Sequence, residues 1–208
     1  MKLIFGIFFK KGVDVMLIFY ECNKNQTRLL LAFLLSKCDF FTFCLPNYGT
    51  IFRMSDPSNV FKEYELVKDN LERDNVDFLV YKQKVSSIIN RFSDDTIKTF
   101  CSIQYYDYLC NYEKEIYLVR YNDKTFKILE NENVFNDWIY PNFPEDLCFL
   151  KNNECYFSSV SHDKEYYIYD DSVQATDFLD EIGIQYTKTE FIEPPKLRRS
   201  NTGDGSVC

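Results

Sequence analysis

Apolar and polar positions alternate along the first fifty residues in a way that predicts three elements. Residues 16–20 form a short apolar run typical of a strand, and residues 29–35, which follow two asparagines suited to capping a helix, are apolar almost all round. A second apolar run covers residues 39–45 and ends at the turn-forming residues 46–49. We therefore predict a strand, a helix covered on more than one side, and a second strand.

The middle of the chain gives mixed patterns. A Ser-Asp-Pro helix-start signature and helical spacing of apolar positions predict a helix over residues 55–71. Residues 77–81 favour a strand and residues 85–92 a short helix, whereas residues 99–110 are compatible with either. The sequence thus leaves this region only partly assigned.

A hairpin is predicted where the second half of the chain begins. Residues 115–121 and 125–129 are apolar runs that flank the polar turn 122–124. A short helix is expected over residues 133–139, before Pro141.

Three further runs predict an antiparallel meander. Residues 147–150 and 155–159 flank the turn Asn152-Asn153, and residues 165–169 supply a third strand. Residues 172–182 then predict a helix closed by Gly183. The fold class we expect is α+β, with an antiparallel β-meander in the C-terminal half packed with helices and preceded by a strand–helix–strand unit.

The same patterns divide the chain into three parts. The central part is expected to be a single globular α+β domain, and Met16 is an alternative start of the protein. The expected boundaries are residues 1–15 for an N-terminal appendage or extra edge strand, residues 16–193 for the domain with possible subdomains 16–112 and 113–193, and residues 194–208 for a flexible basic tail.

Composition narrows the classes of function. The 208 residues are 46% hydrophobic and 18% aromatic, enough to bury a core. A formal charge of −8 argues against nucleic acid as a partner, because that affinity comes largely from clustered Lys and Arg. The chain shows no convincing signal peptide and no run long enough to span a membrane, so we expect a soluble cytoplasmic protein without a membrane partner. Motifs that cradle a nucleotide are missing, and we expect no cofactor.

The eight cysteines lie in apolar strings rather than at the spacings of a disulfide framework. We expect reduced, mostly buried thiols of the kind found in a cytosol. Cys148 and Cys155 fall on one face of the second hairpin, with Leu150 opposite Cys155 and Phe157 opposite Cys148. Because that face resembles core and short paired spacings such as C-x2-C do not occur, we expect no metal site there with His162.

His162 is the only histidine, and it lies among hydroxyls and carboxylates. Together with Asp163, Glu145 and Asp146 it makes the candidate acid–base group, since neighbouring carboxylates can shift one another's pKa. Adjacent residues on a strand point to opposite faces, so His162 is not expected to deprotonate Ser161. The plainer interpretation is a histidine held by hydrogen bonds at a strand end, with no catalytic residue in the chain.

Tyrosines supply the candidate binding surface. Acidic neighbours argue against a platform for nucleic-acid bases, and exposed rings would favour a protein interface, whereas half-buried rings would belong to the strands' packing. The string comprises the binding candidates Tyr105, Tyr106 and Tyr108, followed by Tyr112, Tyr117 and Tyr121.

The segment that begins at Trp138 and reads W-I-Y-P-N-F-P-E-D-L-C-F-L, with S-H-D-K-E at residues 161–165, resembles a family of small proteins from Gram-positive spore-formers and their relatives. That family has the pattern W-x-x-P-x-x-P-E-D-L-x-F before a hairpin and an S-H-E-K-like turn, where this chain has Asp163 in place of Glu. Some members are labelled stage III sporulation protein AH. The resemblance covers residues 138–184, and more loosely 16–45. It implies a fold and no catalytic residues.

We therefore expect a non-catalytic protein that binds another protein, as small regulators, immunity proteins and defence or counter-defence proteins of bacteria or phage do. The alternative is a small enzyme or ligand-binding domain with its site around His162 and the carboxylates of Glu145, Asp146 and Asp163. A pocket converging on His162 would favour the alternative, and an exposed aromatic patch would favour protein binding.

Overall fold

The computed structural model describes residues 15–54, 64–67, 78–105, 108–132, 134–170 and 172–190. The elements follow one another as β1 (Val15–Tyr20), α1 (Lys24–Leu35), β2 (Phe40–Met54), β3 (Tyr64–Val67), α2 (Phe78–Arg91), the 3-10 turn η1 (Ser93–Asp95), β4 (Thr96–Tyr105), β5 (Tyr108–Arg120), α3 (Asp123–Asn131), α4 (Val134–Asp137), β6 (Glu145–Lys151), β7 (Glu154–Val160), β8 (Glu165–Ile168), α5 (Val173–Glu181) and β9 (Tyr186–Glu190).

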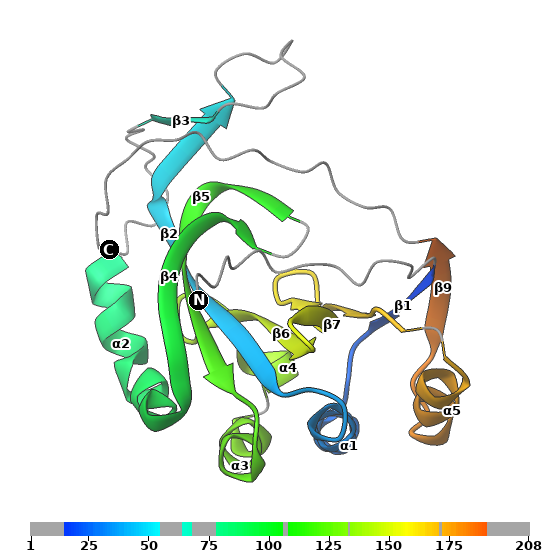
Figure 1. Cartoon of the computed structure of the whole chain (residues 1–208). Helices are drawn as coiled ribbons and strands as arrows, with labels where there is room; N and C mark the ends of the chain where they lie inside the picture. The colour runs from blue at the N-terminus through cyan, green and yellow to red at the C-terminus, as the bar shows by residue number, and fades with distance from the viewer. Residues whose placement is uncertain are drawn as a thin grey trace.

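One curved sheet organises these elements. Its strand order is β4-β5-β2-β6-β7-β8-β1-β9, with β3 paired to β2, and every pairing is antiparallel. Helices α1, α2, α3 and α5 follow the outer side of the sheet, and the end of β2 projects from the rest together with β3 (Figure 1). The α+β class and the β6–β7–β8 meander are as the sequence predicts. The opening unit β1–α1–β2 places its two strands apart, because β6, β7 and β8 lie between them.

Both faces of the sheet carry buried apolar side chains, so its central strands are apolar in nearly continuous runs. The face toward the helices holds the larger core, in which the ring of Phe43 stacks on Tyr117 with centroids 4.9 Å apart and meets Trp138 edge-on at 5.7 Å. The opposite face holds a smaller cluster that includes Cys44, Cys148 and Leu150.

Turn and cap chemistry correctly predicted the turn between β6 and β7 and both ends of helix α5. Asn152 and Asn153 have φ values of 53° and 65°, the left-handed conformation that a tight hairpin turn requires and that Asn tolerates. Ser172 caps α5 by accepting a hydrogen bond from the Ala175 amide. Gly183 follows α5 with a φ of 70°, where a side chain would be strained.

The strand predicted over residues 125–129 is wrong, because this segment is helix α3. Asn122 accepts hydrogen bonds from the backbone amides of Lys124 and Thr125, and the Thr125 hydroxyl accepts one from the Asn122 amide. This capping box starts a helix at the residues that the sequence pattern assigned to a hairpin turn. The apolar spacing then serves a helix, whose buried positions are Thr125 and Leu129.

Three other expectations need correction. Residues 77–81 are not a strand, since helix α2 occupies Phe78–Arg91 and absorbs the short helix expected over residues 85–92. Within the helix expected over residues 55–71, Tyr64–Val67 is strand β3; the remainder lies outside the described residues. The turn expected at residues 46–49 is a bulge, and β2 continues through it to Met54. Strand β9 was not predicted.

The prediction of reduced, mostly buried cysteines is confirmed in part. Five cysteines are buried thiols that form no disulfide: Cys22, Cys38, Cys44, Cys148 and Cys155. Cys101 is disulfide-bonded, so the expectation of reduced cysteines is wrong at that position.

No helix within the described ranges is long and apolar enough to cross a membrane. The N-terminal appendage up to residue 14 and the tail at residues 194–208 lie outside the described residues.

Candidate functional site

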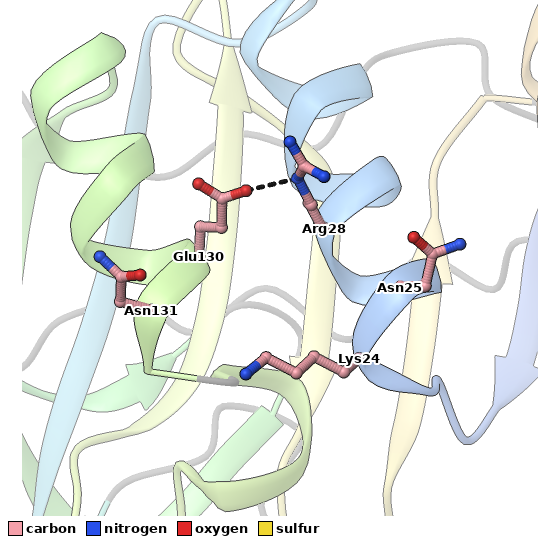
Figure 2. A pocket seen from close by; sticks show the side chains of 5 residues that line it. All are labelled: Lys24, Asn25, Arg28, Glu130 and Asn131. Carbon is pink, nitrogen blue, oxygen red and sulfur yellow. Dashed lines mark ion pairs between the residues drawn. The ribbon is translucent and has the colours of Figure 1, made fainter.

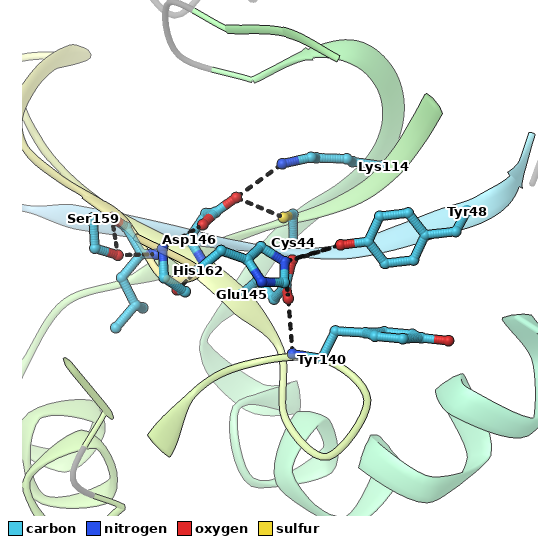
Figure 3. Close-up of polar contacts among 10 residues, drawn as sticks. Cys44, Tyr48, Lys114, Tyr140, Glu145, Asp146, Ser159 and His162 are labelled. Atoms are coloured by element: carbon cyan, nitrogen blue, oxygen red, sulfur yellow. Dashed lines mark hydrogen bonds and ion pairs between the residues drawn. The ribbon is translucent and has the colours of Figure 1, made fainter. Parts of the chain in front are cut away.

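The site is centred on the first two residues of β6, where the strand carries a bulge. Residues Thr42 and Cys44 of β2 pair with Cys148 and Glu145, so β6 has one residue more than β2 over this stretch. Asp146 lies within it and has a φ of 51°, a left-handed conformation that Asp adopts more readily than most residues. Bulges of this kind redirect side chains next to functional sites. Glu145 and Asp146 consequently face different partners (Figure 3).

Glu145 is completely buried and satisfied by three donors. Its Oε1 lies 2.9 Å from Nε2 of His162 and accepts a 2.8 Å hydrogen bond from the Tyr140 amide. The Tyr48 hydroxyl donates to its Oε2 at 3.4 Å. A buried carboxylate is costly unless it is paired and hydrogen-bonded, so these donors are the condition for placing Glu145 here.

His162 lies at the rim, with 47% of its side chain exposed. The hydrogen bond to Glu145 raises the pKa of His162, and the negative charges of Glu145 and Asp146 add to that effect, while partial burial and the Lys114 charge oppose it. The raised pKa favours the imidazolium, which can donate from Nε2 to Glu145. The side chain available to solvent is therefore one whose protonated form is stabilised by a buried carboxylate.

Tyr48 completes the group from β2. Its hydroxyl lies 3.0 Å from Nε2 of His162. Burial and the neighbouring Glu145 charge raise the pKa of Tyr48 far above its ordinary value, so the phenol stays protonated and serves as a donor. The Tyr48 ring packs on Tyr112 at 4.5 Å between centroids and meets Tyr140 edge-on at 4.8 Å. We call the half-buried rings of Tyr48, Tyr112 and Tyr140, together with His162, the tyrosine–histidine rim.

Asp146 belongs to a second, more deeply buried ion pair. Its Oδ2 accepts a 2.8 Å hydrogen bond from Nζ of Lys114, and only 4% of the Lys114 side chain is exposed. Oδ1 of Asp146 accepts from the Ser161 amide, while the Asp146 amide donates to the Ser161 hydroxyl. The Cys44 thiol lies 4.0 Å from Oδ2. This reciprocal pairing fastens the start of β6 to the turn that carries His162.

The hydroxyls near His162 are engaged with backbone groups. Ser161 Oγ accepts from the Asp146 amide at 2.9 Å, and Ser159 Oγ accepts from the Leu147 amide at 2.8 Å. Neither contact is with His162, whereas a serine nucleophile needs a base within hydrogen-bond reach. The arrangement can hold a proton on His162 and present that charge at the surface.

The structure brings together three of the four predicted acid–base candidates, His162, Glu145 and Asp146. Asp163 is exposed in the adjoining turn, and its side chain makes no hydrogen bond or ion pair with the described residues. The contact between Glu145 and His162 is of the kind expected for a histidine held by hydrogen bonds at a strand end. Tyr48 was missed because its neighbours indicated a turn.

Lys114 was also missed, because its neighbours Glu113 and Glu115 give this part of the chain the charged pattern of a solvent-exposed segment.

The predicted tyrosine string divides between core and rim. Tyr117 and Tyr121 are buried, and their hydroxyls donate to Glu115 and to the Leu31 carbonyl. Tyr112 joins the rim. Tyr105 and Tyr108 pair with each other at the ends of β4 and β5, and Tyr106 lies outside the described residues.

A pocket of about 520 Å³ lies away from this site, between α1 and α3 (Figure 2). Its lining side chains are Lys24, Asn25, Arg28, Glu130 and Asn131, and Arg28 is paired with Glu130 at 2.5 Å. Within the described part of the chain, no group of three or more His, Cys, Asp or Glu side chains is arranged to hold a metal ion.

Comparisons with family models, curated proteins and solved structures find no match to the chain. The resemblance to the spore-former family stays a prediction.

Proposed function

We propose that the protein is a non-catalytic binding protein that contacts another protein through the tyrosine–histidine rim. The observation that carries this proposal is that the start of β6 combines a buried carboxylate with exposed neighbouring side chains. Glu145 is buried and fully engaged by Tyr140, Tyr48 and His162, while the rings and the imidazole above it reach solvent. A carboxylate placed in this way orients its neighbours and is not accessible to a substrate.

The composition of the rim supports a protein as the partner. Tyrosines are enriched at the centres of protein interfaces because they offer a large apolar area, a polar tip and few rotatable bonds. The ring contacts of Tyr48 with Tyr112 and Tyr140 hold the surface in one shape before binding, which lowers the entropy lost on association. In its protonated form, which the raised pKa favours, His162 adds a positive charge that suits a carboxylate or a carbonyl on the partner.

The test is affinity capture from the native host with the full chain as bait, compared between two variants. Tyr112→Ala removes a rim ring, and Tyr20→Ala removes a tyrosine that is 56% exposed on β1, four strands away from β2 in the sheet. We expect Tyr112→Ala to lower recovery of a specific partner at least about tenfold, and Tyr20→Ala to leave it unchanged. Both variants are checked for folding by circular dichroism. Equal recovery with both variants would contradict the proposal.

A small-molecule site at His162 is the second candidate, favoured by the exposed imidazolium beside two carboxylates. Inorganic phosphate and acetate, added while the NMR signal of His162 is followed, test it directly. Saturable shifts at millimolar concentrations would favour a ligand site. Shifts no larger than those of a free histidine would favour the protein interface. A cytoplasmic location stays a prediction.

A further inference from the structure

We propose that Cys148 and Cys155 form a dithiol site that a hydroperoxide converts into a disulfide joining β6 to β7. Their sulfur atoms lie 3.1 Å apart, and neither residue is part of a disulfide. The two cysteines come from the two strands of one hairpin, so a bond between them would link the neighbouring strands β6 and β7 on one face of the sheet.

A register shift produces this closeness. Leu150 pairs with Cys155, whereas Cys148 pairs with Ser158 and not with Phe157 as the sequence suggests, because the register changes between Phe149 and Leu150. The two thiols therefore sit diagonally on the same face. Phe157, which the sequence placed beside them, belongs to the opposite face. Diagonal neighbours normally lie too far apart for direct contact, and the irregularity brings these two within reach.

The chemistry balances with one hydroperoxide. One thiol loses its proton and its sulfur attacks a peroxide oxygen, which breaks the O–O bond and gives a sulfenic acid and, from hydrogen peroxide, water. The second thiol loses its proton, attacks the sulfenic sulfur and releases a second water as the S–S bond forms. Two electrons pass from the sulfurs to the peroxide.

Burial makes the site selective. Cys148 is 0% and Cys155 1% exposed, which admits a small oxidant through local opening and excludes bulky thiol reagents. Once a sulfenic acid forms, its nearest reaction partner is the other thiol of the pair. The cross-link would fix the β6–β7 hairpin, and the far ends of these strands carry Glu145 and lead to His162. Oxidation would thus stabilise the support of the tyrosine–histidine rim.

The experiment treats the dithiothreitol-reduced, desalted full chain with hydrogen peroxide, blocks the remaining thiols with iodoacetamide in denaturant, and analyses tryptic peptides by mass spectrometry. Trypsin cuts after Lys151, between the two cysteines, so the disulfide joins two peptides that separate on reduction. We expect Cys148–Cys155 to form at least about ten times more extensively in the folded protein than in the same chain oxidised in urea, because the fold sets a high effective concentration.

Two controls keep the proposal falsifiable. Cys22→Ser, at a buried cysteine outside the pair, should leave the linked peptide unchanged, and Cys155→Ser should remove it. Peroxide should raise the Tm of the reduced wild type by more than that of reduced Cys155→Ser. Both proteins can reform the disulfide of Cys101, and only the wild type can form the Cys148–Cys155 cross-link that restricts the unfolded chain. Recovery of Cys148 and Cys155 as separately blocked or overoxidised residues in the folded protein would overturn the proposal, as would a yield equal to that in urea.

Discussion

Nε2 of His162 lies 2.9 Å from Oε1 of Glu145, and the histidine is half-exposed while the glutamate is completely buried. This difference in exposure determines how much stability the folded protein loses when either residue is removed. A histidine without its glutamate can be hydrated at the rim, whereas a glutamate without its histidine keeps only the Tyr140 and Tyr48 donors for a buried charge.

We expect His162→Ala to lower the free energy of unfolding by about 1 to 3 kcal/mol, because it leaves Glu145 buried with one donor fewer. Glu145→Gln removes the charge and should make the subsequent loss of His162 less costly. Urea unfolding of both single variants and the double variant measures their coupling, expected to be about 0.5 to 3 kcal/mol. Asp163→Asn, in the same turn, is the control and should change stability by no more than about 0.5 kcal/mol. Additive single effects would contradict the pairing.

The raised pKa of His162 predicts a pH dependence of definite sign. Because the folded protein holds this proton more tightly than the unfolded chain, whose histidine has an ordinary pKa near 6.5, the stabilisation is fully present below that pH. It is lost as the pH rises through the folded pKa. His162 is the only histidine, so its ring protons give a single NMR titration curve without assignment.

We expect the midpoint of that curve to lie above 6.5 in the wild type and to fall in Glu145→Gln. As the pH rises above about 6.5, the wild type should lose stability that His162→Gln does not lose. A wild-type midpoint at or below the ordinary value would show that burial outweighs the Glu145 hydrogen bond.

Breaking the ion pair between Lys114 and Asp146 should cost more stability than breaking the contact between His162 and Glu145, because both Lys114 and Asp146 are buried. Lys114→Met leaves the Asp146 charge without its cation and should cost about 3 to 5 kcal/mol. The double variant Lys114→Met/Asp146→Asn should recover part of this loss, since the uncompensated charge is gone. Arg28→Met, which breaks an ion pair with Glu130 from a side chain that is 67% exposed, is the control and should cost at most about 1 kcal/mol. Denaturant unfolding of the four proteins distinguishes the cases.

Sequence patterns predicted the elements whose ends are marked by local chemistry. The β6–β7 turn and helix α5 follow from Asn153, Ser172 and Gly183, which act through their own backbone or the next few residues. Glu145 and His162 could also be singled out from local signals, because both are ionisable residue types and one hairpin joins them.

Contacts set by long-range pairing escaped prediction. Tyr48 reaches His162 only because β2 passes through its bulge and continues beside β5, and Lys114 reaches Asp146 across the sheet from another strand. Hydrophobic spacing cannot show which strands become neighbours, since β2 pairs with strands about seventy and a hundred residues away. Short apolar runs such as residues 77–81 also satisfy both a strand and a buried helix pattern.

Asn122 was predicted to lie in a hairpin turn, and in the structure it caps the start of helix α3. Its side-chain oxygen accepts from the amides of Lys124 and Thr125, and its amide group donates to Asp95 at 2.9 Å. Asn122→Ala should lower the free energy of unfolding by about 0.5 to 2 kcal/mol, because the first amides of α3 lose their acceptor. Asn122→Ser restores that acceptor without the Asp95 contact and should recover most of the loss. Asn131→Ala, at the exposed end of the same helix, controls for the change in residue type. If residues 123–131 formed the strand of a hairpin, Asn122→Ala and Asn122→Ser would be equally damaging; urea unfolding followed by circular dichroism measures the difference.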